Sequence, residues 1–120
     1  WTFFCFIAVF IDSDILSIHV PGSNSEPLLK IENLSTMKKD SLLINISRGG
    51  VVDETALYEV LKNNKIAGAA IDVFSNEPYN GKLIELDNVI LTPHIGSYAK
   101  EGKLKMEIDA VKNIIKYLNY

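Results

Sequence analysis

The stretch Ser41-Leu-Leu-Ile-Asn-Ile-Ser47, followed by Arg48-Gly49-Gly50, decides the fold of this chain. Its apolar residues form an almost unbroken run, which is typical of a strand buried on both faces of a parallel sheet. The two glycines allow a sharp turn where a side chain would clash. Because a helical pattern starts soon after them, Arg48 is predicted at the carboxyl end of a central strand. Open α/β sheets bind their ligands at that end.

Arg48 is also the single arginine of a chain whose other basic residues are all lysines. A planar guanidinium offers a fixed fork of donors that matches a carboxylate, which an ammonium group does not. One interpretation is therefore an anion-binding arginine. The other is a surface arginine that happens to remain in a lysine-rich composition, and position alone does not separate the two.

The composition describes one globular domain of 120 residues, with 48% hydrophobic and 22% charged residues. A net charge of −3 gives no basic surface, so nucleic-acid binding is not expected. Cys5 is the only cysteine, which favours a reducing, cytoplasmic location. Residues 1–11 are nearly all apolar but fall short of the ~20 that span a bilayer, and no membrane partner is expected. They are interpreted as a buried strand or helix that packs against an upstream region.

Strand and helix patterns alternate along the chain. Pro21-Gly22 and Pro93 end apolar runs, and Asp53 is a candidate helix cap. A stripe of apolar residues stepping by three and four predicts an amphipathic final helix. The predicted strands are 14–20, 41–47, 67–74 and 88–92, and the predicted helices are 31–37, 54–63 and 101–118.

This alternation predicts an α/β fold, a partial Rossmann-like doubly wound parallel sheet of about four strands with flanking helices. No Gly-x-Gly-x-x-Gly occurs, so the phosphate-binding turn of a dinucleotide fold is absent from the sequence. Four strands make only part of the usual doubly wound sheet.

Three ionisable side chains follow three successive strands. Arg48 follows the second strand, Glu77 lies in the loop after the third, and His94 follows the fourth. If the strands are parallel neighbours, all three meet at one edge of the sheet. An arginine can hold a carboxylate, a histidine can transfer a proton near neutral pH, and a nearby carboxylate fixes which ring nitrogen faces the substrate. Together they suit reduction of a 2-keto acid.

Each residue also has a purely structural interpretation. Glu77 fits a solvated loop acid, and His94 fits a surface or capping residue. His19, within an apolar strand pattern, is interpreted as a hydrogen-bonded structural histidine. Asp72 lies in an apolar segment, where burial is costly without partners, so it should lie at the functional end of its strand or be paired. No metal-ligand spacing and no serine nucleophile elbow occur.

Four segments of the chain together carry a family resemblance: Asp14-Ile-Leu-Ser-Ile-His-Val-Pro21, Leu43-Ile-Asn-Ile-Ser-Arg-Gly-Gly-Val-Val-Asp-Glu54, Ala67-Gly-Ala-Ala-Ile-Asp-Val-Phe74 with Glu77-Pro78, and Leu91-Thr-Pro-His-Ile-Gly-Ser97. They occur in family order and with family-like spacing over roughly residues 11–118, which is more specific than any one alone. Trp1–Phe10 shows no such match and is assigned no role. With these segments the chain resembles the D-isomer-specific 2-hydroxyacid dehydrogenase family. The resemblance implies that residues 1–120 are the carboxyl-terminal portion of its dinucleotide-binding (Rossmann) domain, without the glycine-rich half and without the substrate domain.

The resemblance implies an NAD-dependent oxidoreductase acting on a D-2-hydroxy acid or 2-keto acid. Arg48 would bind the substrate, His94 would be the acid/base, and Glu77 would be its partner. The run Gly96-Ser-Tyr-Ala-Lys-Glu101 is most similar to phosphoglycerate dehydrogenase-like members, and a homodimer is expected of the full-length parent. Asp72 would lie near the nicotinamide amide. The implied NAD contacts are Val20, Ile46, Ser47, Arg48, Asp72, His94, Ile95, Gly96 and Ser97.

With half of the cofactor cradle absent, the isolated chain is expected to bind NAD poorly and to turn over little or nothing. NAD rather than NADP is only the family default. Two other hypotheses stay open. One is a non-catalytic, NAD-sensing interaction module with a dehydrogenase fold, against which the complete Arg48, Glu77 and His94 set argues. The other is an inactive truncated product.

Overall fold

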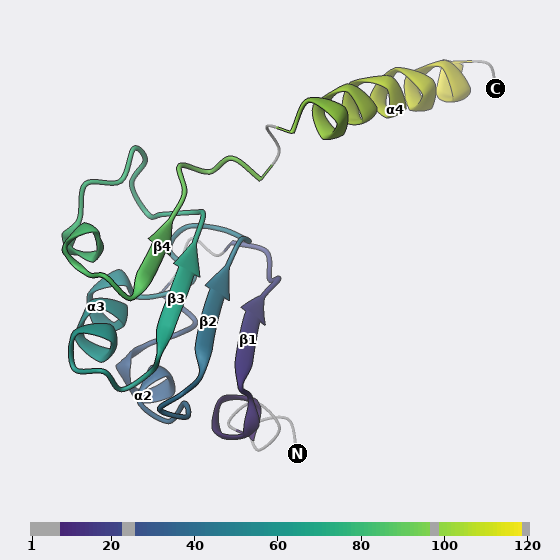
Figure 1. Cartoon of the computed structure of the whole chain (residues 1–120). Helices are drawn as coiled ribbons and strands as arrows, with labels where there is room; N and C mark the ends of the chain where they lie inside the picture. The colour runs from purple at the N-terminus through teal and green to yellow at the C-terminus, as the bar shows by residue number, and fades with distance from the viewer. Residues whose placement is uncertain (1–7, 23–25, 97–98, 119–120) are drawn as a thin grey trace.

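The computed structural model describes residues 8–22, 26–96 and 99–118, and its centre is a four-stranded parallel sheet (Figure 1). The strands are hydrogen-bonded in sequence order, and every neighbouring pair is parallel. Their carboxyl ends therefore share one edge, and the α/β, Rossmann-like prediction is confirmed. The strands are β1 (Ile15–Ile18), β2 (Leu42–Asn45), β3 (Gly68–Ile71) and β4 (Val89–Leu91).

Helical segments connect the strands. Helix α3 begins where expected, because the Asp53 carboxylate accepts the N–H groups of Thr55 and Ala56 at 2.9 and 3.1 Å. A short helical segment over residues 8–12 precedes β1, and Phe10 in this segment is buried. The named helices are α2 (Ile31–Leu34), α3 (Glu54–Lys62), the 3₁₀ helix η1 (Lys82–Glu85) and α4 (Lys100–Leu118).

The hydrophobic core lies on one face of the sheet. Leu43 of β2 and Ile71 of β3 belong to one buried cluster with residues of α2, α3 and η1, among them Leu34, Leu57 and Leu83. Because consecutive strands are neighbours in one direction, right-handed crossovers place their connecting helices on the same side. The sheet is therefore covered from the side of α2 and α3.

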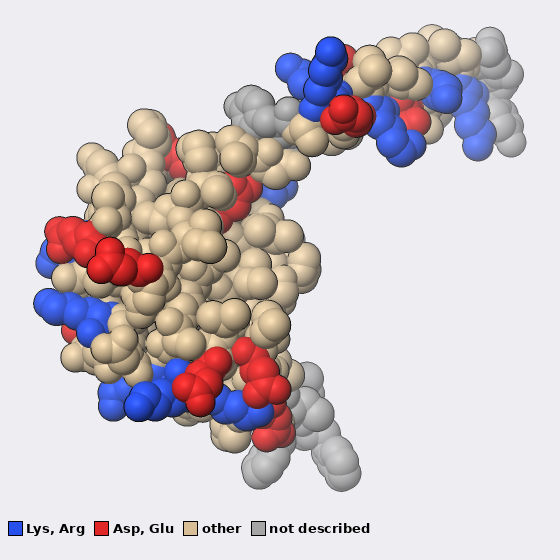
Figure 2. Space-filling view, viewed as in Figure 1, with Lys and Arg blue, Asp and Glu red and all other residues tan. Residues whose placement is uncertain are grey.

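The opposite face of the sheet is open, which corrects the prediction that β2 is buried on both faces. The exposed fractions are 61% for Ile15, 41% for Leu42 and 68% for Ile90, all on this face by strand register. Charged side chains gather at the rims of the body and along α4, while the surface over the strands is largely uncharged (Figure 2). We call Ile15, Leu42 and Ile90 the open apolar face.

Helix α4 extends away from the body of the molecule (Figure 1). Its apolar stripe was predicted, but none of its described residues is buried; Leu104 and Val111 are both 56% exposed. Among the described residues, no helix combines the length and apolarity needed to cross a membrane.

Several strands are shorter than predicted. The strand expected over 67–74 ends at Ile71, and Asp72 begins an irregular segment at the carboxyl edge. The strand expected over 14–20 ends at Ile18. His19 is consequently exposed rather than within the strand, although its Nε2 atom lies 2.8 Å from the Ser17 hydroxyl.

Candidate active site

The turn after β2 is organised by a buried amide. Asn45 is 2% exposed, and its Oδ1 atom accepts from the backbone N–H and the hydroxyl of Ser47, at 3.1 and 2.8 Å. Its Nδ2 atom donates to the carbonyl of Arg48 at 3.2 Å. Both ends of the side chain thus fold the Ser47–Arg48 segment over the strand end.

The two glycines after Arg48 are needed for different reasons. A Cβ atom on Gly49 would lie 1.9 Å from the carbonyl oxygen of Phe74, so the turn after β2 touches the backbone beyond β3 directly. Gly50 has a φ of +75°, in the left-handed region that favours glycine. This close approach brings Arg48 beside the segment that carries Glu77.

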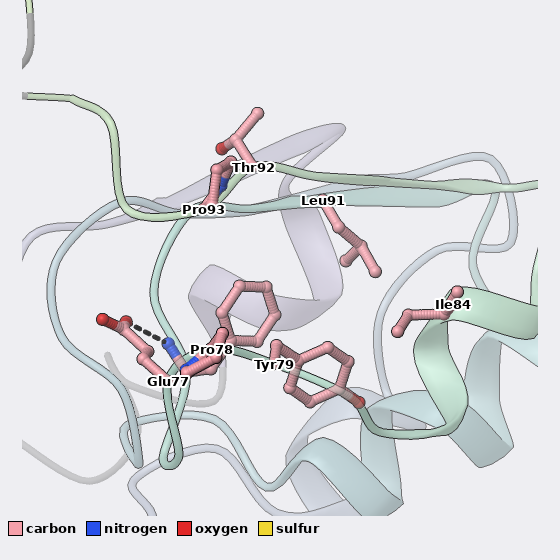
Figure 3. A pocket seen from close by; sticks show the side chains of 8 residues that line it. Glu77, Pro78, Tyr79, Ile84, Leu91, Thr92 and Pro93 are labelled. Carbon is pink, nitrogen blue, oxygen red and sulfur yellow. Dashed lines mark hydrogen bonds between the residues drawn. The ribbon is translucent and has the colours of Figure 1, made fainter.

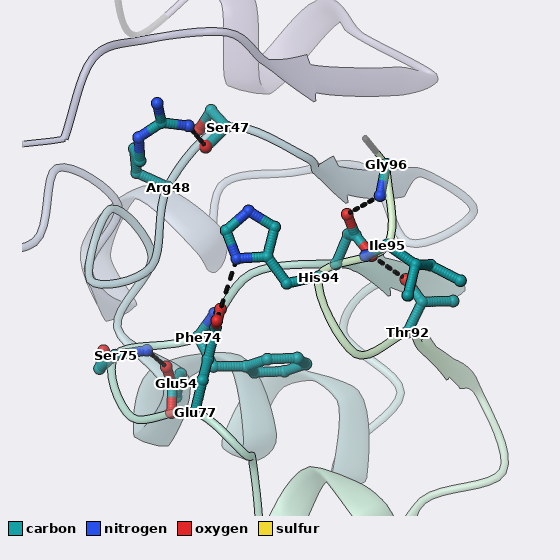
Figure 4. A network of polar contacts seen from close by, with 11 residues as sticks. Ser47, Arg48, Glu54, Phe74, Ser75, Glu77, Thr92, His94, Ile95 and Gly96 are labelled. Carbon is teal, nitrogen blue, oxygen red and sulfur yellow. Dashed lines mark hydrogen bonds and ion pairs between the residues drawn. The ribbon is translucent and has the colours of Figure 1, made fainter. Parts of the chain in front are cut away.

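The Glu77 carboxylate is held from two sides. Its Oε1 atom accepts the N–H of Phe74 at 3.0 Å, and its Oε2 atom lies 2.9 Å from Nδ1 of His94 (Figure 4). The Phe74 N–H and, next, the His94 ring hold the pKa of Glu77 below its ordinary value. The carboxylate is thus kept ionised as the partner of the imidazole.

His94 has a φ of +55°, a left-handed conformation that costs a non-glycine residue about 1–2 kcal/mol. Its N–H donates to the carbonyl of Thr92 at 3.0 Å, across Pro93. With Nδ1 directed at the carboxylate of Glu77, the neutral ring carries its proton on Nδ1, which leaves Nε2 free to exchange a proton with a ligand.

Arg48, Glu77 and His94 line one cleft of about 550 Å³ at the carboxyl edge of the sheet. The side chains of His94 and Glu77 are 47% and 38% exposed, so the pair is open to solvent. Arg48 donates from Nη1 to the carbonyl of Ser47 at 2.7 Å and forms no ion pair with any described residue. Most guanidinium donors therefore remain for an anion.

Asp72 fixes the segment on either side of His94. Its carboxylate is 7% exposed and accepts the Thr92 hydroxyl at 2.5 Å, the N–H of Ile95 at 3.0 Å and the N–H of Gly96 at 3.1 Å. Burial by itself raises the pKa of Asp72, but these three hydrogen bonds outweigh it, and the pKa is lowered. The expected partners of this acid are all in the loop after β4.

A second cavity, of about 360 Å³, lies on the other side of Glu77 (Figure 3). It is lined mainly by apolar side chains, and the rings of Phe74 and Tyr79 stack with centroids 4.2 Å apart. Glu77 thus stands between an apolar cavity and the polar cleft. Its bond to the Phe74 N–H, drawn in Figure 3, anchors it at that boundary.

The residues expected to contact NAD are only partly together. Ile46 and Ile95, 54% and 46% exposed, lie beyond the ends of β2 and β4 and offer apolar surface at the carboxyl edge. Asp72 uses three of about four acceptor positions, which leaves one for an amide donor. Val20 lines a different cleft, and Ser97 lies outside the described residues.

These residues fit the nicotinamide end of a dinucleotide. Exposed aliphatic side chains suit the faces of a planar ring, and the free acceptor position on Asp72 suits a carboxamide. The sequence holds no glycine-rich turn for the phosphates, so only this half of the cofactor is matched. Within residues 8–22, 26–96 and 99–118, no group of three or more His, Cys, Asp or Glu could hold a metal ion.

Sequence reasoning missed Asn45 and Thr92. Asn45 was visible as the one polar residue inside an apolar run, the same signal that singled out Asp72. Thr92 carries no such signal, because threonine is ordinary at the end of a strand. Its role depends on the hydrogen bond to Asp72, 20 residues away in the chain.

Comparison with known proteins gives matches both in sequence and in structure. The family described as D-isomer specific 2-hydroxyacid dehydrogenase, NAD binding domain, matches residues 2–96. The chain is 44% identical over 112 residues to D-3-phosphoglycerate dehydrogenase of Escherichia coli, covering 88% of this chain and 27% of that protein. It is 47% identical over 111 residues to glyoxylate reductase of Pyrococcus horikoshii, covering 88% and 32%.

Among solved structures, an acyclic imino acid reductase in complex with NADPH and D-Arg is 40% identical, with a TM-score of 0.85 over 95% of this chain and 37% of that one. The chain thus spans about a third or less of the two curated relatives named. The family match begins at residue 2, so the expectation that Trp1–Phe10 falls outside the family pattern is wrong. Residues 1–7 lie outside the described part of the structure.

Proposed function

Because the chain belongs to the D-isomer-specific 2-hydroxyacid dehydrogenase family, we propose that it carries the acid/base and substrate-binding residues of an enzyme that interconverts a D-2-hydroxy acid and its 2-keto acid. The observation that carries the proposal is the shared cleft, in which Arg48, Glu77 and His94 converge from three strand ends. The parent activity is phosphoglycerate dehydrogenase-like.

Each side chain has one task in this proposal. The Arg48 guanidinium binds the carboxylate of the keto acid, because its donors are free and match a carboxylate. His94 gives a proton from Nε2 to the carbonyl oxygen in the reductive direction and takes it back in the oxidative direction. Glu77 orients the ring through Nδ1 and stabilises the charged imidazolium.

NAD(H), when bound, supplies or accepts the hydride. On this chain Ile46, Ile95 and the free acceptor position of Asp72 would hold its nicotinamide end. NAD is proposed over NADP as the family default. NADP is the alternative to test, because the similar acyclic imino acid reductase is in complex with NADPH. The phosphates would need a glycine-rich turn that the sequence does not contain.

The test is a graft enzyme: the Pyrococcus horikoshii glyoxylate reductase in which this chain replaces the matching 111 residues. We expect it to oxidise NADH with glyoxylate. Arg48→Lys should raise KM for glyoxylate more than it lowers kcat, because charge is kept and the two-pronged geometry is lost. Lys105→Arg on α4 is the control, and unchanged KM in Arg48→Lys rejects the substrate role.

The isolated chain is proposed to show little or no turnover. NADH oxidation with glyoxylate or hydroxypyruvate by the purified 120-residue chain would overturn that. The NAD-sensing module would instead show NADH-dependent affinity for a protein partner and no reductase activity in the graft enzyme. A homodimer of the full-length parent and a cytoplasmic location stay predictions that rest on the family and on the single cysteine.

A further inference from the structure

We infer that Asp72 and Thr92 are positioning residues that hold His94 in its left-handed conformation, so that its ring meets Glu77. This inference rests on the proposed acid/base role of His94. It assigns Asp72 a task within the protein, in addition to any contact with a cofactor, and it assigns Thr92 a task that its sequence context did not reveal.

The hydrogen bonds of Asp72 enclose His94 in the chain. One donor, the Thr92 hydroxyl, comes two residues before the histidine, and the other two, the N–H groups of Ile95 and Gly96, come directly after it. The distances are 2.5, 3.0 and 3.1 Å. A single carboxylate thus fixes both flanks of the residue at which the backbone takes a positive φ.

The strand that directly precedes Asp72 is itself firmly placed. β3 is paired on both sides, with β2 and β4, and the N–H of Asp72 donates to the carbonyl of Asn45 at 3.0 Å. The loop after β4, by contrast, is exposed from Pro93 to Gly96 and has little packing of its own. The charge-assisted bonds to Asp72 tie this loop to the end of β3.

The loop backbone at Gly96 also has little room to approach Asp72 in a different way. A Cβ atom on Gly96 would lie 3.2 Å from Oδ2 of Asp72, so the loop backbone is already in close contact with the carboxylate. If these bonds are lost, only the N–H bond of His94 to the Thr92 carbonyl and the ring's contact with Glu77 oppose relaxation of this L-residue toward negative φ. The ring would then move away from Glu77.

The pairing with Glu77 has a spectroscopic signature. Neutral His94 carries its proton on Nδ1 as long as Glu77 accepts it, and long-range ¹H–¹⁵N spectra of the imidazole rings show which nitrogen is protonated. The chain has only two histidines, and His19→Gln identifies the other signal. The spectra are recorded on the 120-residue chain at about pH 9, above the ordinary titration range of histidine.

The experiment compares variants of the loop anchor. The Glu77→Ala variant gives the reference signals of a His94 ring without its carboxylate partner. Asp72→Asn should move the His94 ring signals at least half of the way from wild type to Glu77→Ala, since the amide nitrogen, in whichever of the two oxygen positions it stands, cannot accept from the backbone N–H of Gly96 or of Ile95. Thr92→Val should cause a smaller shift in the same direction. Thr92→Ser, which keeps the hydroxyl, and Asp109→Asn on α4 should leave the signals unchanged.

A folded Asp72→Asn chain with the wild-type ring signals would overturn the inference. If Asp72→Asn does not fold, Thr92→Val decides, and ring signals equal to those of Thr92→Ser contradict it. A different result tests the proposed function: if Glu77→Ala leaves the wild-type ring signals unchanged, the His94–Glu77 pair itself does not form. Failure of the positioning role alone would leave that pair, and the proposed function, intact.

Discussion

The Nδ1 atom of His94 lies 2.9 Å from Oε2 of Glu77, although the two residues are 17 positions apart and follow different strands. Both side chains are more than a third exposed, so their pairing contributes little to the stability of the fold. Its consequence is chemical: it sets which ring nitrogen is available to a ligand.

Glu77→Ala should therefore separate activity from stability. In the graft enzyme we expect kcat to fall about tenfold or more, because the imidazole loses its orientation and the stabilisation of its charged form. The thermal unfolding midpoint of the 120-residue chain should stay close to that of wild type. Steady-state kinetics and circular dichroism check the two halves, and a large loss of stability with unchanged kcat would contradict the assignment.

The loss of folding stability at acid pH should depend on Asp72. Its pKa is lowered in the folded chain relative to an unfolded value of ~3.9, so the unfolded chain binds more protons in this range. The stabilisation is complete above that value and is lost as pH falls toward the folded pKa. Urea unfolding at stepped pH between about 6 and 3 should show a shallower decline in the free energy of unfolding for Asp72→Asn than for wild type. Asp109→Asn is the control, and parallel curves for wild type and Asp72→Asn would refute this origin.

The turn after β2 can be tested with a pair of glycines. Gly49→Ala places a methyl group 1.9 Å from the carbonyl oxygen of Phe74, so backbone must move and Arg48 with it. We expect a loss of about 2 kcal/mol or more in the free energy of unfolding. Gly102→Ala, in α4, meets nothing closer than 3.9 Å and should be neutral or stabilising by ~0.5–1 kcal/mol. Equal effects of the two substitutions would contradict the close approach.

Much of the site was predictable because parallel strands end at one edge. Arg48, Glu77 and His94 each follow a strand, so their convergence follows from strand order and direction alone. The loop geometry was not predictable. The positive φ of His94 and the bond from Thr92 to Asp72 depend on contacts across the sheet that no local pattern encodes.

The fold shows the same division. Apolar runs predicted four strands, and Asp53 predicted the start of α3. Periodicity states which side chains share a face but not what covers that face. Leu42 and Ile90 were therefore expected to be buried or left unassigned, whereas the structure leaves them exposed. Periodicity likewise predicts the apolar stripe on α4, but it does not predict that the helix has no buried residue.

The open apolar face gives a test of the truncated-product hypothesis. A folded chain should bind the dye ANS at this face, and Ile90→Lys should reduce that binding with little change in the thermal midpoint, since Ile90 is 68% exposed. Leu83→Lys, at a fully buried position, should unfold the chain and increase ANS binding. Equal ANS binding by wild type and Leu83→Lys would indicate a molten chain instead.

The most direct test is the glyoxylate-dependent oxidation of NADH by the graft enzyme with and without the His94 imidazole. If His94 transfers the proton, His94→Asn should lower kcat by about 10²- to 10⁴-fold and leave KM nearly unchanged, because Arg48 still binds the substrate. A His94→Asn enzyme whose kcat stays within a few-fold of the unmodified graft would contradict the account.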